Sequence, residues 1–463
     1  MAFVEAKRDR GVDEESYSCT ATIPDDGIAP ASAKNAALRR AEIVRLDKSR
    51  VWHPYTAMDA WESVDPIVVA RADGPYLWDE NGARFIDGNS SWWTSALGHR
   101  HPRVVAAIKR QLETLDHCAL GGIAHEHSAR LAEELCAIAP AGMSRVFYTD
   151  NGSTAIEAAV KMCVQFFAQN GKPNKSRFVA LDGAFHGDSI GAASLGGVPI
   201  FRRPFASVLF ECVHAPFPGD YQAAFAAMKD LITREHDTIA AVVVEPVVQG
   251  AAGMRIYDAR YLTELVEIAR AHEVLVIFDE VFTGYGRTGP MWASEHAGVS
   301  PDLMCIGKAF AGGVLPMAAV LATERVFDAF RGDATRAFYY GHTFCGNPLG
   351  AAIAREVLAI FRDEKIADQV ARKQRLISQA FARIAQIPGV ARVRSIGMIG
   401  AADLGEAGYE GGLGWRVYEE AKKRGAYLRP LGDTVYVCPP LVIEDSVLTE
   451  LLQILEDSVR AVT

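Results

Sequence analysis

Between about residues 100 and 330, stretches with a helical spacing of apolar side chains alternate with short, continuous apolar runs. The clearest helical stretches are Ser128–Ala139 and Ala155–Gln169. The apolar runs, which have the length of buried strands, are Arg145–Tyr148, Phe178–Leu181, Ala240–Val244, Val274–Phe278, Leu303–Ile306 and Ala318–Leu321. This alternation predicts an α/β fold whose sheet is doubly wound and mostly parallel.

The segments on either side of this region have a different pattern. Residues 66–82 predict a β-meander, because a Gly-Pro break and an Asn-Gly turn separate its apolar runs. After residue 349, helices and short strands are predicted at Leu349–Asp363, Val390–Ile396, Met398–Leu404, Tyr427–Pro430, Val435–Cys438 and Ser446–Val462. This order is typical of a smaller α+β domain.

We therefore expect four parts along the chain. Residues 1–45 predict a poorly ordered N-terminal extension that runs into a short helix near Asn35–Asp47. Residues 46–99 would contribute to the small domain, 100–348 would form the large ligand-binding domain, and 349–463 would form the C-terminal small domain. The length of 463 residues agrees with two or three domains.

Composition and charge narrow the possible functions. The net charge is -9 and no Lys/Arg cluster forms a basic stripe, which argues against nucleic-acid binding. Apolar runs stay well short of the roughly 18 residues that a membrane span needs. The eight cysteines include no C-x-x-C pair, and the N-terminus has no signal-peptide pattern. We therefore expect a cytoplasmic protein with reduced thiols.

The most informative chemistry lies at the ends of two apolar runs. Asp279 directly follows Val274–Phe278, and Lys308 follows Leu303–Ile306 after a single glycine. In a doubly wound sheet, ligands bind beyond the carboxyl ends of the strands. An amine and a carboxylate there suit pyridoxal phosphate: the amine forms a Schiff base with the aldehyde, and the carboxylate keeps the pyridine nitrogen protonated.

A phosphate site is predicted where a strand leads into the helix Ala155–Gln169. Thr154 and Glu157 have the spacing of a capping box, and Gly152 lets an anion approach the backbone. Alone, this run could be an ordinary capped helix. A competing G-x-G-x-x-G motif at Gly284–Gly289 is weak evidence for a dinucleotide, because no clear helix follows it.

With these residues in place, the chain resembles the class III pyridoxal-phosphate aminotransferases from about residue 50 to its end. The run Phe278–Gly289, followed by Pro301-Asp302-Leu303 and Gly307-Lys308-Ala309, is similar to the signature of that family. The resemblance implies fold type I of the PLP-dependent transferases, with pyridoxal 5'-phosphate as cofactor. It also makes Gly284–Gly289 a structural turn. Residues from two protomers usually build such sites, so the resemblance implies a homodimer.

Further runs are similar to the class III enzymes that aminate 8-amino-7-oxononanoate in biotin synthesis. They are Val51-Trp52-His53-Pro54-Tyr55, Ser90-Ser91-Trp92-Trp93-Thr94, Gly98-His99-Arg100-His101-Pro102, Val244–Gly250 and His342–Pro348. This resemblance implies S-adenosylmethionine as the amino donor, although some relatives use lysine.

The resemblance also implies roles for individual residues. Tyr55, Trp92 and Trp93 would line the substrate pocket, and Arg429 would pair with the carboxylate of the oxo acid. Gly152 and Ser153 would hold the phosphate, with Thr343 reaching it across the dimer interface.

Two departures from the family pattern are Phe185, where a tyrosine is usual, and His342, where a proline commonly precedes the threonine. Phe185 can still stack on the cofactor ring, but it has no hydroxyl.

Simpler interpretations of several residues remain open. Trp92 and Trp93 could be core aromatics, because neighbours on a strand face opposite ways and a bend would be needed for both to line one pocket. Arg429 could be a surface residue, and Glu245 either an ion-pair partner or a catalytic support. The closely spaced histidines His99 with His101 and His125 with His127 lack the accompanying ligands of a metal site, so no metal is expected.

Three other functions stay open. The first is another class III transaminase that acts on an ω-amino acid or a diamine. The second is a racemase or decarboxylase on the same scaffold. The third is a noncatalytic binding or dinucleotide protein. The aminotransferase interpretation predicts ping-pong kinetics, in which the freed Lys308 amine moves a proton between the donor carbon and the cofactor.

Overall fold

The computed structural model describes residues 33–406 and 408–463, which separate into two units, residues 1–68 and 69–463. Most of the predicted N-terminal extension lies outside the described residues. Within the first unit, α1 (Ala33–Arg50) is the short helix expected near Asn35–Asp47, and α2 (Met58–Ser63) follows. Asp47 accepts a hydrogen bond from the indole of Trp61 at 3.0 Å.

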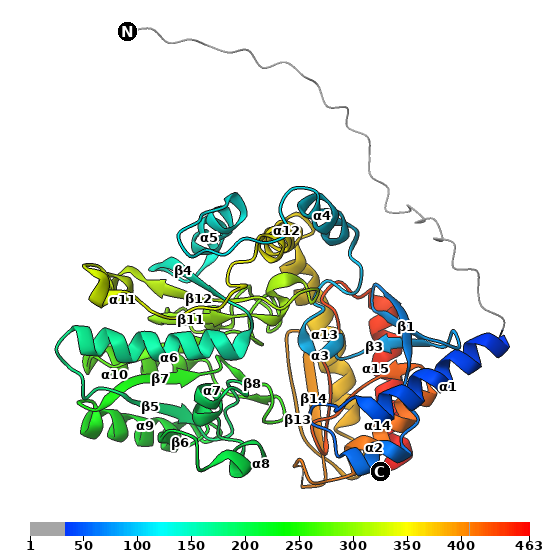
Figure 1. Cartoon of the computed structure of the whole chain (residues 1–463). Coiled ribbons are helices and arrows are strands. Elements are labelled where there is room, and N and C mark those ends of the chain that lie inside the picture. The colour runs from blue at the N-terminus through cyan, green and yellow to red at the C-terminus, as the bar shows by residue number, and fades with distance from the viewer. Residues whose placement is uncertain (1–32, 407) are drawn as a thin grey trace. The chain divides into compact units, whose positions relative to one another are not determined.

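The second unit contains a seven-stranded sheet with the strand order β4-β12-β11-β10-β7-β5-β6 (Figure 1). Its strands are β4 (Met143–Thr149), β5 (Arg177–Leu181), β6 (Cys212–Ala215), β7 (Ile239–Val244), β10 (Leu275–Asp279), β11 (Leu303–Ile306) and β12 (Ala318–Thr323). All six predicted strands are present. β12 runs antiparallel to both neighbours, while the β11-β10-β7-β5-β6 pairs are parallel. The sheet is therefore mixed and parallel-rich.

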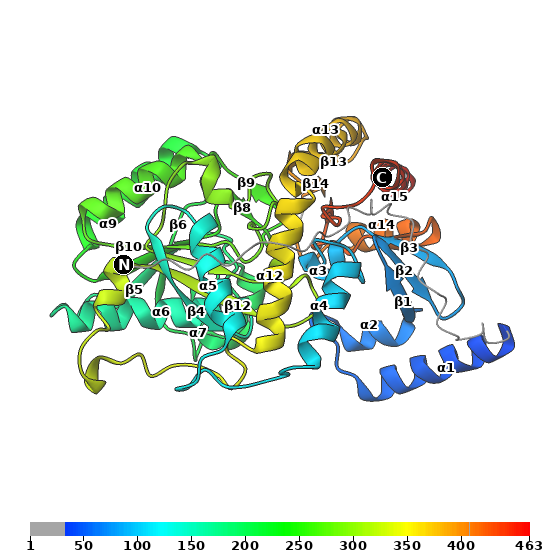
Figure 2. The ribbon, with the colours of Figure 1, turned by 90° about the horizontal axis from the view of Figure 1, so that it is seen from above.

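Helices cover both faces of this sheet, as Figure 2 shows from above. Along β7, Ala241 and Val243 pack into a cluster with α6 (Gly152–Gln169), whereas Val242 and Val244 pack with α9 (Tyr221–Glu235) and α10 (Arg260–Ala271). Since successive side chains of a strand point to opposite faces, a strand buried on both sides has to be apolar throughout. The doubly wound α/β fold is thus confirmed.

The chain before and after this region forms two smaller sheets. The two strands expected within residues 66–82 are present as β1 (Val69–Asp73) and β2 (Tyr76–Asp79). A third strand, β3 (Arg84–Asp87), follows the Asn-Gly turn, and β15 (Ala426–Tyr427) pairs with it. The second sheet contains β13 (Val390–Ile396), β14 (Ile399–Leu404) and β16 (Thr434–Val437). The helices of the C-terminal part are α12 (Pro348–Asp363), α13 (Ile366–Ile384), α14 (Leu413–Lys423) and α15 (Asp445–Val462). Segments from the two ends of this unit therefore lie side by side.

Further elements connect these layers. They are α3 (Ser90–Trp93), α4 (Pro102–Leu112), α5 (Glu126–Ile138), α7 (Ile190–Leu195), α8 (Pro199–Arg202), α11 (Glu324–Asp328), β8 (Val248–Gln249) and β9 (Arg255–Ile256). Within the described ranges, no helix has both the length and the apolar character that crossing a bilayer requires. The seven cysteines that the structure describes are free thiols.

Candidate active site

The predicted amine and carboxylate meet at one edge of the main sheet. Asp279 is the last residue of β10, and Lys308 follows β11 after Gly307. The two strands are parallel neighbours, with Asp279 opposite Cys305. Both side chains line one cavity of about 670 Å³. Its lining includes Trp93, Gly152, Ser153, Phe185, Glu245, Asp279 and Lys308. The sheet thus brings together residues that lie far apart in the sequence.

Lys308 is held in an unusual conformation and an unusual environment. Its backbone has a φ of 49°, a left-handed value that is uncommon for a residue with a side chain. Burial lowers the pKa of its ammonium group, against the opposing charges of Asp279 and Glu245. Its Nζ lies 5.3 Å from the ring centroid of Trp93. A lowered pKa increases the fraction of neutral amine, which is the form that attacks an aldehyde.

Asp279 is fixed by a histidine that we did not predict as a site residue. The Nδ1 atom of His186 lies 2.8 Å from Asp279 Oδ2, and the backbone N–H of Val281 donates to Asp279 Oδ1 at 3.1 Å. Both His186 and Asp279 are buried. These contacts hold the carboxylate in one orientation, with its charge directed into the cavity. The sequence signal for His186 is its place next to Phe185.

Glu245 anchors the aromatic residue of the cavity through backbone contacts. Its carboxylate accepts hydrogen bonds from the N–H of Phe185 at 3.1 Å and of Gly250 at 2.9 Å. Burial raises the pKa of Glu245 to about 7. Of the two interpretations left open, the contacts match a support for Phe185 better than an ion pair.

The helix at the predicted phosphate end begins earlier than its sequence pattern suggested. We expected a capping box of Thr154 and Glu157. Instead, Asn151 is the N-cap: its side chain accepts from the N–H of Thr154 at 3.1 Å, and its own N–H donates to Thr154 Oγ1 at 3.0 Å. Glu157 accepts from the N–H groups of Gly191 and Ala192. Because α6 starts at Gly152, its first turn, where helices have N–H groups without a partner inside the helix, lines the cavity.

Gly187 lets the loop after Phe185 approach this helix closely. Its φ is 127°, and a Cβ added there would lie 2.2 Å from Ser153 Oγ. Ser153 Oγ accepts a hydrogen bond from the N–H of Asp188 at 3.1 Å. The helix start, Ser153 and the Phe185 loop therefore form one continuous wall of the cavity.

The two tryptophans lie on a left-handed turn, which supplies the bend that a shared pocket requires. Ser90, Ser91, Trp92 and Trp93 all have positive φ, between 45° and 74°. Trp93 is buried and lines the cavity, whereas Trp92 is 39% exposed. The Arg429 guanidinium lies 4.6 Å from the ring centroid of Trp92, and the Arg429 N–H donates to Asn89. Arg429 and Trp92 thus form a separate pair beyond the lining of the cavity.

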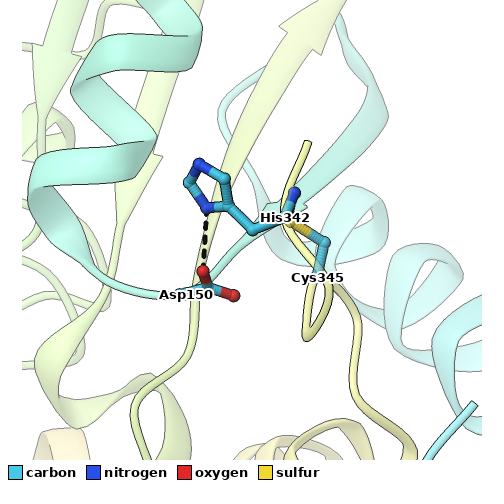
Figure 3. A group of neighbouring side chains, drawn as sticks. All are labelled: Asp150, His342 and Cys345. Carbon is cyan, nitrogen blue, oxygen red and sulfur yellow. Dashed lines mark hydrogen bonds and ion pairs between the residues drawn. The ribbon is translucent and has the colours of Figure 1, made fainter. Parts of the chain in front are cut away.

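Thr343 lies on an exposed loop that contacts the phosphate end from outside the cavity. In Figure 3 the His342 ring points at Asp150, with Nδ1 2.8 Å from Oδ2. The N–H of His342 donates to Cys345 Sγ at 3.1 Å. Donor atoms of these three residues lie within 4.8 Å of one another, a spacing that would admit a metal ion. Because they already contact each other, we interpret them as the link between this loop and the strand end before Asn151.

The other residues that the sequence suggested as candidates contact parts of the fold away from the cavity. Gly284–Gly289 forms consecutive turns that lead, after three more residues, into the short 3-10 helix Ala293–His296. The Arg287 side chain donates to the carbonyl of Pro439 at 2.7 Å. His99 and His101 contact Asp87 and Glu364. His125 caps α5, while His127 contacts Arg355. Tyr55 lies in the first unit, between α1 and α2, and its role stays a prediction.

The residues present fit pyridoxal phosphate. Lys308 would bind the aldehyde, Asp279 the pyridine nitrogen, and Phe185 one face of the ring. The start of α6 with Ser153 would hold the phosphate, because its N–H groups and positive dipole end attract an anion. The glycines at 152 and 187 leave open a cradle that a Cβ would fill.

Comparisons with known proteins agree with this geometry. A family model described as "Aminotransferase class-III" matches residues 57–459. The chain is 38% identical to adenosylmethionine-8-amino-7-oxononanoate aminotransferase from Geobacter sulfurreducens, over 90% of this chain and 97% of the relative. A crystal structure of the enzyme so named from Methanocaldococcus jannaschii has a TM-score of 0.89 and 30% identity, covering 91% and 99% of the two chains. The omega transaminase from Pseudomonas jessenii in complex with PMP has a TM-score of 0.86 and 29% identity, with 91% and 99% covered.

Proposed function

The chain belongs to the class III aminotransferases, and we propose that it aminates 8-amino-7-oxononanoate to 7,8-diaminononanoate in biotin synthesis. As a member of this family it has fold type I of the PLP-dependent transferases and is a PLP-dependent aminotransferase. The observation that carries the proposal is the pair of Lys308 and Asp279 at adjoining strand ends in one cavity. Relatives named for this reaction, similar over nearly the whole chain, support the substrate.

The chain's own residues divide the work of the reaction. When bound, pyridoxal phosphate supplies an aldehyde that takes up the donor's amino group and a ring that withdraws electrons from the donor carbon. Lys308 would hold the cofactor through its amine and, once free, would remove and return the proton of the donor carbon. Asp279, oriented by His186, would hold the ring nitrogen of the cofactor and stabilise its positive charge. Glu245 holds the Phe185 backbone, which keeps the aromatic ring in place.

At the acceptor end, we propose that Arg429 binds the carboxylate of the oxo acid, with Tyr55, Trp92 and Trp93 around the rest of the substrate. A guanidinium suits this task because it binds a carboxylate through two parallel hydrogen bonds. The ring of Trp92 already lies against Arg429, which limits the positions that the guanidinium can take. S-adenosylmethionine is the proposed amino donor, and lysine is the other candidate.

The decisive experiment is incubation of the cofactor-loaded enzyme with 8-amino-7-oxononanoate and each candidate donor. We expect mass spectrometry to detect 7,8-diaminononanoate with S-adenosylmethionine. No product with either donor would contradict the proposed substrate. Turnover of an ω-amino acid or diamine in its place would support the alternative, which the likeness to the Pseudomonas jessenii omega transaminase favours.

We also propose that the protein acts in the cytoplasm as a homodimer in which Thr343 reaches the phosphate site of the partner. The loop around Thr343 exposes large apolar side chains: Phe344 is 60% and Tyr339 is 81% accessible. Such exposure is typical of a surface that another protein covers.

Light scattering should give the mass of a dimer. Mixing Lys308→Ala and Thr343→Ala variants should restore activity, because one site of each mixed dimer is then complete. Inactive mixtures would contradict the shared site.

A further inference from the structure

Tyr409 connects the loop between β14 and α14 to the wall of the cavity. Its hydroxyl donates a hydrogen bond to the backbone carbonyl of Ala251, a residue that lines the cavity. Burial raises the pKa of Tyr409, so the phenol stays protonated and keeps its donor. The contact joins positions 158 residues apart in the sequence. The C-terminal part of the chain is thereby attached to the cofactor side of the site.

Aromatic rings make a second connection between the same two places. Tyr409 packs edge-on against Phe201 with ring centroids 4.9 Å apart, and Phe201 packs edge-on against Phe185 at 5.7 Å. Both distances lie within the range of favourable aromatic pairs. Since Phe185 lines the cavity, a row of three rings leads from the cavity wall to Tyr409.

On its other side, the Tyr409 loop is fixed to the turn that follows Arg429. The N–H of Asp433 donates to the carbonyl of Gly408 at 2.9 Å. A Cβ added at Gly432 would lie 2.5 Å from the Cα of Tyr409, so the two backbones are in close contact. The Arg429 charge also reaches Tyr409, since it opposes the rise of the phenol pKa. The loop that carries Tyr409 therefore contacts both the cavity wall and the turn that follows Arg429.

We propose that Tyr409 is a positioning residue that sets the distance between Arg429 and the reacting end of the cavity, and so selects the chain length of the acceptor. This inference rests on the proposed function, because it concerns an acceptor with a carboxylate at one end and a ketone at the other. Such a substrate reacts efficiently only if Arg429 and Lys308 are the correct distance apart. The Ala251 bond and the ring contacts of Tyr409 contribute to that distance, together with the contacts of Arg429 to Asn89 and Trp92.

The test compares Tyr409→Phe, which removes only the hydroxyl, and Tyr409→Leu, which also removes the ring, with wild type. The control, Tyr261→Phe, deletes the hydroxyl of a buried tyrosine on α10 among Tyr257 and Phe225. For Tyr409→Phe we expect the KM for 8-amino-7-oxononanoate to rise about three- to tenfold, because this factor corresponds to the free energy of one lost hydrogen bond. Tyr409→Leu should show a larger rise, and the control none.

Two further readouts separate positioning from a general structural effect. The preference for 8-amino-7-oxononanoate over the analogue one methylene shorter should fall in both Tyr409 variants. With no acceptor present, a small donor amine lowers the absorbance of the bound cofactor as it reacts. The rate of this decrease should be the same in the variants as in wild type.

Unchanged KM and chain-length preference in both variants would overturn the inference, as would an equal loss in the acceptor-free reaction. Wild-type enzyme that never aminates 8-amino-7-oxononanoate would instead refute the proposed function, before any variant is compared.

Discussion

A methyl group added at Gly152 would disturb the phosphate end of the site. In Gly152→Ala the new Cβ would lie 2.6 Å from Cγ1 and 3.2 Å from Cγ2 of Val281. Non-bonded carbons prefer about 3.5–4.0 Å, so these groups must separate by roughly 1 Å. Because Gly152 is the first residue of α6, we expect the strain to displace the N–H groups that face the phosphate.

Overpacking of this size costs about 1–3 kcal/mol of stability. If moving the N–H groups relieves this strain, cofactor binding should weaken by up to roughly 150-fold, the factor that about 3 kcal/mol corresponds to. Titration of the cofactor-free variant with pyridoxal phosphate, followed by absorbance, measures this loss. Adding Val281→Ala removes both clashing methyl groups and should restore most of the affinity. The control is Gly412→Ala, whose added Cβ meets nothing within 4 Å. Wild-type affinity in Gly152→Ala, or no recovery in the double variant, would refute this reasoning.

Two further substitutions test other parts of the site. A third tests Glu280, the buried acid that follows Asp279 and accepts hydrogen bonds from the N–H groups of Ala293 and Ser294. In Asp279→Asn the loss of the carboxylate charge should lower kcat/KM by about 10²–10³-fold, and steady-state kinetics with more than half of the activity left would contradict its role. Burial raises the pKa of Glu280 from its ordinary value of 4.5 to about 7. Folding therefore favours its protonated form. As the pH rises from 4.5 to 7, the free energy of unfolding of wild type should fall by up to about 3 kcal/mol relative to that of Glu280→Gln. Urea-unfolding measurements that give the same pH dependence for both proteins would exclude this penalty. Arg429→Lys keeps the positive charge but cannot form the two parallel hydrogen bonds. The KM for the acceptor should therefore rise about tenfold, while the reaction with the donor is unaffected. An unchanged KM would place the substrate carboxylate elsewhere.

The sequence predicts the main sheet well because strands buried on both faces must be apolar. Val274–Phe278 and Leu303–Ile306 could be recognised for this reason, and Asp279 and Lys308 were placed at the same edge by the rule for parallel sheets. The edge strand β6 was missed, since three of its four side chains are only partly buried and one of these is His214. An edge strand carries a weaker apolar pattern than a central one.

Contacts over long sequence separations could not be predicted. His186 and Asp279 are 93 residues apart, and Glu245 is 60 residues from Phe185. The left-handed turn at Trp92 and Trp93 has no glycine to indicate it. The capping box was misplaced because Asn151 and Thr154 are both good N-cap residues, and their spacing to later side chains allows either start.

The attachment of the cofactor to Lys308 is the central claim, and chemical trapping tests it most directly. The enzyme loaded with pyridoxal phosphate would be reduced with borohydride, digested and analysed by peptide mass spectrometry. We expect the reduced phosphopyridoxyl label on the peptide that contains Lys308, and no label in Lys308→Ala. A label on a different lysine, or none in wild type, would contradict the assignment.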